Sequence, residues 1–414
     1  MTLDQKVIII GAGLGGLVVA HACQSQNIPY ELFERDSSSE SRTQGWSISL
    51  HMAIDSIKNA VTFPGAFDHF GKRVSVNRED PDGIAFSFID GLNDEIIYHV
   101  ENKLPGDSYR IHRKRFRDWL ISGLNPEKVH WSKKFSRYVS DKDSVTVCFD
   151  DDTSVKGGIL VAADGALSSV CNQLVGGQEQ FDKMTLITPV RSFAVDSWVS
   201  VEEWEKFRAF SNCFGMVTGT DQRDGSSSNL FWAINDTDFN RKDGKPIQML
   251  WAISKYDSDQ VIPHYETNGE CLKALKDWAQ NSFKEDGLFQ RMILETPDDA
   301  QVFQFTIRER TPTLETLATD KRVFLVGDAA HCMTMFRGEG GNHAMLDSGN
   351  LGTQLGLYYN GEKELDAIHQ DYYNEMSTRG AKAVADSHEA AISFHLHRER
   401  MITIFKTMQR HINQ

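Results

Sequence analysis

Apolar runs and amphipathic stretches alternate along the first part of the chain. Residues 7–10 (VIII) form a short apolar run that ends at a glycine, which predicts a buried parallel strand. A helix is expected over 14–26, and residues 30–34 predict the second strand. This strand–helix–strand opening is typical of a doubly wound α/β sheet. The same alternation of apolar runs and amphipathic stretches predicts a strand and a helix within 45–60, a helix over 113–124, a hairpin near 138–149 and a strand over 157–165.

The pattern of apolar and polar residues changes after about residue 181. Segments rich in Phe, Val, Ile, Trp and Thr are separated by clusters of Gly, Asp and Ser, which is typical of an antiparallel sheet; they are 184–195, 212–220, 229–235 and 247–254. A helical stretch is expected over about 270–294, and strands near 301–307 and 322–326 return the chain to the first domain. No proline follows Pro312, so the tail is expected to form long helices.

Composition narrows the class of protein. Lys and Arg number 44 and Asp and Glu number 58, so the net charge is −14, which argues against general affinity for DNA, RNA or anionic lipid. The six cysteines contain no C-x-x-C pair, which fits a reducing cytoplasmic compartment. Neither a secretory signal nor an apolar run long enough to span a membrane is found. No metal-binding motif is present, and His395 and His397 face different ways on a predicted helix.

A glycine-rich motif follows the first strand. Residues 11–16 (GAGLGG) satisfy G-x-G-x-x-G, in which the glycines permit a tight turn, close approach of a pyrophosphate and close helix packing. The helix that follows presents free N–H groups to an anion. An acidic residue closes the second strand, where a carboxylate can bind a ribose hydroxyl and would repel a 2′-phosphate. This pattern predicts NAD or FAD, bound by Gly11, Gly13, Leu14, Gly15, Gly16, Glu34 and Arg35.

A second motif distinguishes these two cofactors. Residues 323–348 contain a strand that ends in Gly327-Asp328, then a loop, and then a glycine-rich helix start. This arrangement resembles the flavin-contacting motif of class A FAD-dependent monooxygenases, the family of para-hydroxybenzoate hydroxylase. The resemblance implies that Asp328 contacts the ribityl-pyrophosphate region of FAD. It also implies that the helix start points at the flavin ring, through Gly338, Gly340, Gly341 and Asn342.

Three further segments carry the same resemblance in the family's order. Residues 163–170 (ADGALSSV) are similar to its middle D-G motif with Asp164, and residues 111–113 (IHR) to the motif whose arginine, here Arg113, lies against the cofactor. Residues 44–52 (QGWSISLHM), with Ser47 and Ser49, fit the loop that lines the flavin. Within this family, the sequence most resembles the fungal monooxygenases of secondary metabolism.

The resemblance implies a domain division. A Rossmann-like FAD-binding domain in two parts (1–175 and 306–360) is interrupted by an antiparallel substrate domain (176–305), and C-terminal helices (361–414) follow. Three positions depart from the family's pattern. Met335 stands where a proline shapes the loop over the flavin, and Glu339 stands between the helix-opening glycines in place of glutamine. Cys171 replaces the arginine that commonly ends the D-G motif, which puts the docking of NAD(P)H or flavin in question.

The family's reaction implies the function. NAD(P)H, which docks transiently, reduces the flavin; O2 adds at the C4a carbon, and the hydroperoxide transfers one oxygen to an apolar, aromatic or polycyclic small molecule. No second G-x-G-x-x-G is present, which is consistent with transient docking. The alternatives are a non-oxygenating flavoprotein (a reductase, oxidase or cyclase) and a nicotinamide-only dehydrogenase. Hydroxylation, epoxidation and Baeyer–Villiger insertion stay open, as do NADH versus NADPH and monomer versus homodimer.

One residue of the second sheet is a catalytic candidate. Arg191 precedes Phe193 and Val195 on one predicted strand, so all three share a face. If that face lines the pocket, the guanidinium of Arg191 is expected to stabilise a developing oxyanion on the substrate. The other interpretation is a surface arginine. Half of the aromatic residues of this sheet must face away from the pocket; they are Phe193, Phe214, Phe231, Trp232 and Trp251. His331, directly after GDAA, is interpreted as a structural hydrogen-bonding residue.

Overall fold

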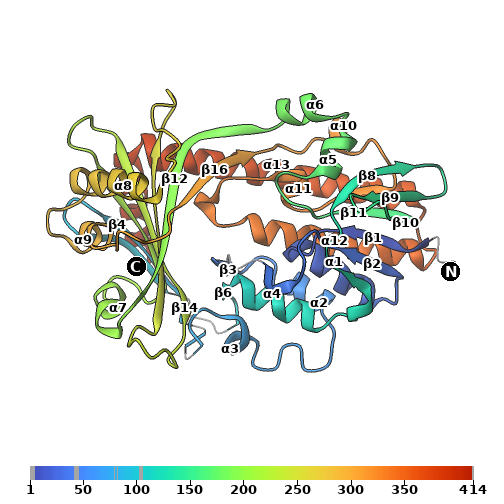
Figure 1. Ribbon diagram of the computed structural model, residues 1–414, viewed down its shortest axis with the longest axis horizontal. Helices are drawn as coiled ribbons and strands as arrows, with labels where there is room; N and C mark the ends of the chain where they lie inside the picture. The colour runs from blue at the N-terminus through green and yellow to red at the C-terminus, as the bar shows by residue number, and fades with distance from the viewer. Residues whose placement is uncertain (1–4, 42–45, 79, 82, 102–105, 413–414) are drawn as a thin grey trace. The chain divides into compact units, whose positions relative to one another are not determined.

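The computed structural model describes residues 5–41, 46–78, 80–81, 83–101 and 106–412. The chain divides into two compact units, each assembled from three segments; Figure 1 labels elements of both where there is room. Unit 1 contains residues 1–74, 113–186 and 308–388, and unit 2 contains residues 75–112, 187–307 and 389–414. This division differs from the predicted one, because the segment 75–112 belongs to unit 2 and the C-terminal helices are divided between the units.

Two early strands explain why the segment 75–112 belongs to unit 2. β4 (Ala85–Asp90) pairs in parallel with β13 (Phe214–Thr220), and β5 (Glu95–Glu101) pairs antiparallel with β4. Parallel pairing requires a long crossover connection, so no hairpin turn marks it in the sequence.

The core of unit 1 is a parallel sheet with the strand order β17-β11-β1-β2-β7. Its central strands β1 and β11 are continuous apolar runs and are buried along their whole length, as expected where helices cover both faces of a sheet. The strands are β1 (Val7–Ile10), β2 (Tyr30–Phe33), β7 (Val129–His130), β11 (Ile159–Ala162) and β17 (Val323–Leu325). An antiparallel sheet accompanies it, formed by β8 (Phe135–Ser140), β9 (Val145–Phe149) and β10 (Ser154–Gly157).

Helix packing in unit 1 depends on small residues. A Cβ on Gly352 of α12 would lie 2.5 Å from the Cβ of Ala22 in α1, so only glycine permits this approach of the two helices.

The other elements of the unit are α2, α3, α4, α5, α6, α10, α11 and β3. The bounds are α1 (Leu14–Ser25), β3 (Ser47–Leu50), α2 (Ile54–Ala60), α3 (Phe70–Val74), α4 (Arg113–Ser122), α5 (Ser169–Leu174), α6 (Gln178–Lys183), α10 (Leu314–Leu317), α11 (Asp328–His331), α12 (Gly340–Tyr359) and α13 (Leu365–Leu396).

Unit 2 is built on a seven-stranded sheet in the order β16-β12-β15-β14-β13-β4-β5. The strand pairs β12–β15, β15–β14, β14–β13 and β4–β5 are antiparallel, and the pair β13–β4 is parallel. The remaining elements of this unit are β6 (Tyr109–His112), β12 (Leu186–Val199), α7 (Val201–Arg208), β14 (Ser227–Thr237), β15 (Ile247–Tyr256), α8 (Asn268–Ser282), α9 (Leu288–Leu294), β16 (Phe303–Glu309) and α14 (Arg398–Ile412).

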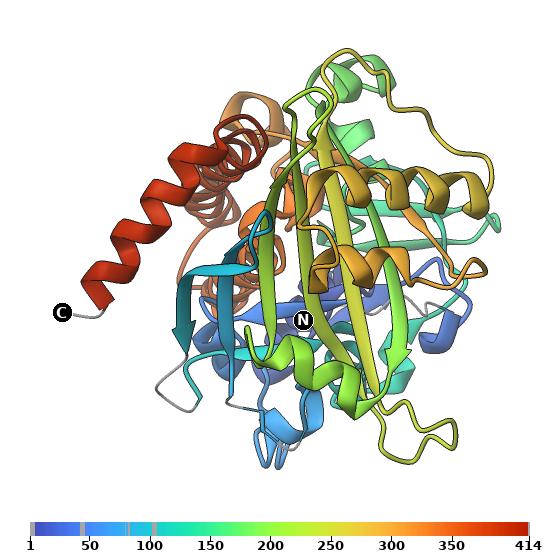
Figure 2. The same ribbon diagram turned by 90° about the vertical axis from the view of Figure 1, so that its left-hand side faces the viewer.

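The two faces of this sheet differ in what covers them. One face packs against α7, α8 and α9, which lie in front of the long strands in Figure 2, and it carries Phe193, Trp232 and Trp251 in a buried apolar cluster. The opposite face carries Phe214 and Phe231, whose ring centroids are 6.1 Å apart. The expectation that the aromatic residues divide between the faces is thus met. Within the described ranges, no helix is long and apolar enough to cross a bilayer.

The end of α13 packs onto the second face of the sheet through a buried histidine. His395 is 2% exposed; its Nε2 lies 2.9 Å from the Oγ of Ser254 and its Nδ1 lies 2.6 Å from the carbonyl O of Ala391. Burial lowers the pKa of His395 to about 4. His21 in unit 1 is similarly buried, and burial lowers its pKa to about 4. His397 is exposed.

Acid should therefore destabilise the protein before its carboxylates titrate. Below pH 6.5 the unfolded chain binds a proton at each of these histidines and the folded chain does not, so stability falls as the pH falls toward 4. The loss is roughly 1.4 kcal/mol for each pH unit and each histidine. Urea unfolding at pH 7 and pH 5 measures it. His395→Gln should reduce the difference, and exposed His411→Gln should not; equal midpoints at both pH values would contradict the prediction.

Candidate cofactor site

The turn between β1 and α1 closes so tightly that two of its glycines cannot carry a side chain. Gly11 has a φ of 105°, and a Cβ there would lie 2.4 Å from the carbonyl O of Ala163. A Cβ on Gly16 would lie 2.0 Å from the carbonyl O of Gly11. Gly13 has an ordinary φ of −78°, and the nearest neighbour of a Cβ there is 4.0 Å away. The fold therefore requires Gly11 and Gly16, whereas only a ligand would require Gly13.

The acidic residue at the end of β2 has a role in this turn that the sequence did not reveal. Glu34 is 3% exposed; its Oε2 accepts a hydrogen bond from the amide of Ala12 at 2.7 Å, and its Oε1 accepts one from the amide of Asp36 at 3.1 Å. Arg117, one helical turn after Arg113, donates from Nε to the carbonyl O of Ala12 at 2.8 Å. Side chains thus hold both the amide and the carbonyl of Ala12. Arg117 is a site residue that sequence reasoning missed.

A cleft of about 370 Å³ lies at the carboxyl ends of β1, β2, β11 and β17, within unit 1. This is the edge at which open α/β sheets bind ligands. The structure brings most of the predicted cofactor residues together in its lining: Gly11, Gly13, Leu14, Gly15, Glu34, Arg35, Arg113, Asp164, Asp328, Gly338, Gly340 and Gly341. Lining residues that the sequence analysis did not select include Ile48, Lys133, Lys134, Phe135, Leu167, Met333 and Thr334.

Four predicted cofactor residues are outside this lining: Gly16, Ser47, Ser49 and Asn342. Gly16 serves the packing of α1. On β3, Ile48 lines the cleft while its neighbours Ser47 and Ser49 do not, as strand alternation requires. The carboxamide of Asn342 is buried and donates to the carbonyl O of Ser49 at 2.8 Å, while its Oδ1 accepts from the amide of His51 at 3.1 Å. Asn342 therefore attaches β3 to α12. Residues 44 and 45 of the predicted flavin loop lie outside the described residues.

Four cationic side chains line the cleft beside the carboxylates of Glu34, Asp164 and Asp328. Arg35, Arg113, Lys133 and Lys134 line it. The N-termini of α1 and of the 20-residue helix α12 also begin at it, with Leu14 and Gly340 among its lining residues. Cationic side chains and helix N-termini both favour an anionic ligand such as a pyrophosphate.

Asp164 provides a test of whether a dinucleotide fits. Its Oδ2 accepts hydrogen bonds from the amides of Ser169 at 2.9 Å and Val170 at 3.3 Å, while its buried Oδ1 has no partner among the described residues. Burial raises the pKa of Asp164 above its ordinary value. A buried oxygen without a donor is costly, and a hydroxyl of a bound cofactor would satisfy it. This oxygen, the open space at Gly13, and the cationic side chains and helix N-termini at the cleft together fit FAD.

The turn that carries Asp328 is supported from behind by a buried ionic network. Gly327 has a φ of 60°, and its amide donates to the Oδ2 of Asp347 at 2.7 Å. The Nε2 of His331 lies 2.7 Å from the same oxygen, and Arg379 donates to the Oδ1 of Asp347 at 2.6 Å. Burial disfavours the charged form of His331, but the Asp347 carboxylate outweighs this and raises the pKa of His331. His331 therefore has the structural position that the sequence favoured.

The three departures from the family's pattern occupy different places. Met335 lines the cleft and is 46% exposed. Glu339 forms an ion pair with Arg337, with Nη2 and Oε1 2.9 Å apart. Cys171 is fully buried in α5, behind the Asp164 turn, and burial raises the pKa of its thiol to about 11. Among these positions only Met335 changes the surface that a cofactor meets.

Arg191 lies on the covered face of the unit 2 sheet. The ring of Phe193, on the same face, lies 5.5 Å from the ring of Trp278 in α8 (between centroids). The guanidinium of Arg191 donates from Nη2 to the carbonyl O of Pro263 at 3.2 Å. The premise that the Phe193 face lines a pocket is therefore wrong, because α8 covers it. This placement favours a structural role for Arg191 over a catalytic one.

Arg191→Ala should keep its FAD and its turnover per bound flavin. The variant loses one charge-assisted hydrogen bond to a backbone carbonyl, which is worth about 1.5–3 kcal/mol, so its unfolding midpoint should fall. Flavin content, product rate and urea unfolding are measured on the same preparation. An alanine variant with full flavin content and most of its turnover lost would restore the catalytic role.

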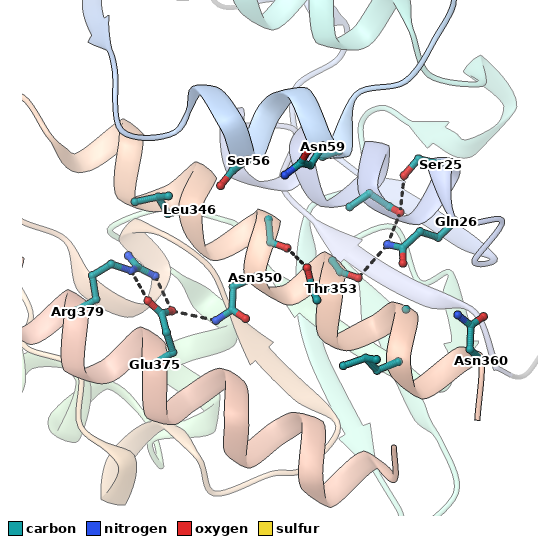
Figure 3. A pocket seen from close by; sticks show the side chains of 16 residues that line it. Ser25, Gln26, Ser56, Asn59, Leu346, Asn350, Thr353, Asn360, Glu375 and Arg379 are labelled. Carbon is teal, nitrogen blue, oxygen red and sulfur yellow. Dashed lines mark hydrogen bonds and ion pairs between the residues drawn. The ribbon is translucent and has the colours of Figure 1, made fainter. Parts of the chain in front are cut away.

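Unit 1 also has a groove of about 690 Å³ on its outer surface, between α1, α2, α12 and α13 (Figure 3). Glu375 joins Arg379 and Asn350 along one wall. The glycines of its floor are explained by helix packing: a Cβ on Gly349 would lie 2.8 Å from the side chain of Ser56. No feature of this groove requires a ligand in the way that Gly13 and Asp164 do.

Comparison with known proteins gives a consistent result. A profile of the FAD binding domain family matches residues 123–387. The "FAD-dependent monooxygenase thnD" of Trichoderma harzianum is 30% identical over 402 residues, which cover 93% of this chain and 92% of the relative. A "probable FAD-dependent monooxygenase" of Arthroderma benhamiae is 28% identical over 412 residues, covering 94% of this chain and 91% of the relative.

Solved structures share the fold. Klebsiella pneumoniae HpxO complexed with FAD and uric acid has a TM-score of 0.75 at 17% identity, with 98% of this chain and 93% of that chain covered. A salicylate hydroxylase substrate complex has a TM-score of 0.73 at 19% identity, with 99% and 95% covered. A nicotinamide-only dehydrogenase does not account for these matches or for the Asp328 turn. The chain belongs to the FAD binding domain family and is an FAD-dependent monooxygenase.

Proposed function

We propose that the chain uses NAD(P)H and O2 to insert one oxygen atom into an apolar, aromatic or polycyclic small molecule, with the second oxygen atom leaving as water. The observation that carries the substrate class is the second face of the unit 2 sheet. Phe86, Phe214 and Phe231 follow one another across adjacent strands, with centroid distances of 5.3 and 6.1 Å. Aromatic side chains on a sheet face favour contact with a flat apolar molecule.

Polar groups on the same face would orient such a molecule. The guanidinium carbon of Arg110 lies 4.8 Å from the centroid of Phe214. On β12, Asp196 accepts a hydrogen bond from Nε2 of Gln248 at 2.9 Å, and burial raises the pKa of Asp196. A few polar groups among aromatic ones are typical of small-molecule sites. The uric acid and salicylate hydroxylase complexes among the structural neighbours support a small-molecule substrate.

The residues of unit 1 would hold the cofactor. Bound FAD supplies hydride acceptance and the activation of O2. Gly13 and the N-terminus of α1 would admit the pyrophosphate, Arg113 would balance its charge, and Asp164 and Asp328 would accept hydrogen bonds from its hydroxyls. The α12 N-terminus would favour negative charge on the reduced ring. The hydride donor would dock transiently.

An isotope experiment tests the reaction type. The purified protein should be yellow with one FAD per chain, and a true substrate from a panel of aromatic and polycyclic compounds should speed NAD(P)H consumption. In the presence of ¹⁸O2 the product should gain one ¹⁸O atom. Product formed at the full rate without O2 would contradict the proposal and favour a non-oxygenating reaction.

A further inference from the structure

A buried arginine lies directly behind the cofactor cleft. Arg310 follows β16, is 0% exposed, and its amide donates to the carbonyl O of Cys332 at 2.9 Å. Its guanidinium carbon lies 4.1 Å from the centroid of the Phe181 ring. All of these residues belong to unit 1. Neither cofactor motif includes Arg310, so nothing in the sequence analysis selected it.

The guanidinium joins two turns that line the cleft, the one that carries Asp164 and the one that carries Asp328 at the start of α11. Nη2 donates to the carbonyl O of Ala166 at 2.8 Å, in the turn that carries Asp164. Nη1 donates to the carbonyl O of Asp328 at 3.3 Å and to that of Ala329 at 3.1 Å, in the turn that carries Asp328. Because the guanidinium is planar and rigid, these bonds fix the distance between the two turns.

The remaining donors are also engaged. Nε and Nη2 donate to the Oγ1 of Thr185 at 3.3 and 3.2 Å. None of the ion pairs between described residues involves Arg310. A buried charge that meets only carbonyls, a hydroxyl and a ring is expensive, and an apolar side chain would fill the same volume at lower cost. The guanidinium is therefore explained by what it joins rather than by packing.

We propose that Arg310 is a positioning residue for the cofactor site: its guanidinium locks the Asp164 turn and the Asp328 turn together, so that FAD meets both carboxylates in one preformed arrangement. This inference rests on the proposed cofactor contacts of Asp164 and Asp328. Without the Arg310 guanidinium, the two turns should move independently of each other. FAD binding would then have to order them.

The chain offers a matched control in the same unit. Arg322 also uses its guanidinium to bind backbone carbonyls, those of Asp141, Lys142 and Gly158. It precedes β17, at the amino end of the parallel strands, away from the cleft. Replacing Arg322 removes the same kind of interaction without touching either turn.

The experiment measures FAD affinity and amide exchange of the apoprotein. Arg310→Ala and Arg310→Lys should bind FAD about 10- to 100-fold more weakly than the parent, and Arg322→Ala should bind it normally. Hydrogen exchange should rise in both turns together, over 164–169 and 327–331, in the Arg310 variants only. Guanidinium chloride at low millimolar concentration should restore affinity to Arg310→Ala, whereas sodium chloride at equal ionic strength should not.

Several results would overturn the inference. These are normal FAD affinity of a folded Arg310→Lys, exchange that rises in one turn alone, and weak binding of Arg310→Ala that guanidinium does not relieve. If Arg310→Ala does not fold, Arg310→Lys with its exchange pattern decides. Failure of the parent protein to bind FAD would contradict the proposed function instead, so the two failures are distinguishable.

Discussion

Gly13→Val is expected to purify without FAD while its apoprotein remains folded. The backbone of Gly13 is extended, with a φ of −78° and ψ of 180°, and this conformation suits valine. A Cβ there would meet no atom closer than 4.0 Å, so the fold loses little beyond a weaker helix N-cap. The added methyl groups enter the space through which a pyrophosphate reaches the α1 amides. FAD affinity should therefore fall by more than about 100-fold.

The control is Gly16, a glycine of the same turn that the fold requires whether or not a ligand is bound. A Cβ on Gly16 would lie 2.0 Å from the carbonyl O of Gly11, so Gly16→Ala should lower the stability of the apoprotein itself. Fluorescence titration with FAD and urea unfolding of the apoproteins separate the two effects. Normal FAD affinity in Gly13→Val would show that the cofactor does not approach this turn.

Asp328→Ala is expected to lose most of its FAD as well, again without loss of the fold. The Asp328 side chain is exposed and lines the cleft, and the structure describes no hydrogen bond or ion pair from its carboxylate. Its removal therefore breaks no described contact within the protein. A carboxylate that accepts two cofactor hydrogen bonds contributes about 3 kcal/mol or more, which corresponds to roughly 100-fold in affinity. Asp328→Asn should be intermediate, because the amide oxygen still accepts.

Flavin occupancy after purification and the FAD dissociation constant of the apoprotein measure this effect. Asp366→Ala is the matched control, since Asp366 is an exposed carboxylate of unit 1 that pairs with Lys321 on the surface. Full occupancy and parental affinity in Asp328→Ala would refute the assignment of this residue to the cofactor.

The strands β1, β11 and β17 of the parallel sheet were predictable because each is a contiguous apolar run that is buried along its length, whereas β7 has only two half-buried residues and was not predicted. The glycine motif and Asp328 were predictable because a short local pattern carries them. Arg117 and Arg310 were not, since their partners are backbone carbonyls from distant segments, and any sequence can supply a carbonyl. The parallel pairing of β4 with β13 was missed for a similar reason, because it has no local turn signal.

Arg191 shows a different limit. Strand alternation correctly placed it on the same face as Phe193, but alternation does not say which face is covered. That depends on where α8 packs, and the covering residue Trp278 lies more than eighty positions later in the chain. Cys171 could likewise be identified as a departure, whereas its burial behind the Asp164 turn required the structure.

The lining of the cleft extends from Ile10 to Ala344, and the chain passes between the units after residues 74, 112, 186, 307 and 388. During synthesis, β1 therefore leaves the ribosome long before its partner β11, and the sheet lacks β17 until residue 325 has been added. Until then the sheet is incomplete, and its apolar strands are more exposed to aggregation or chaperone capture than in the native protein. Flavin loading is consequently a late event, and neither unit can be produced as one uninterrupted fragment.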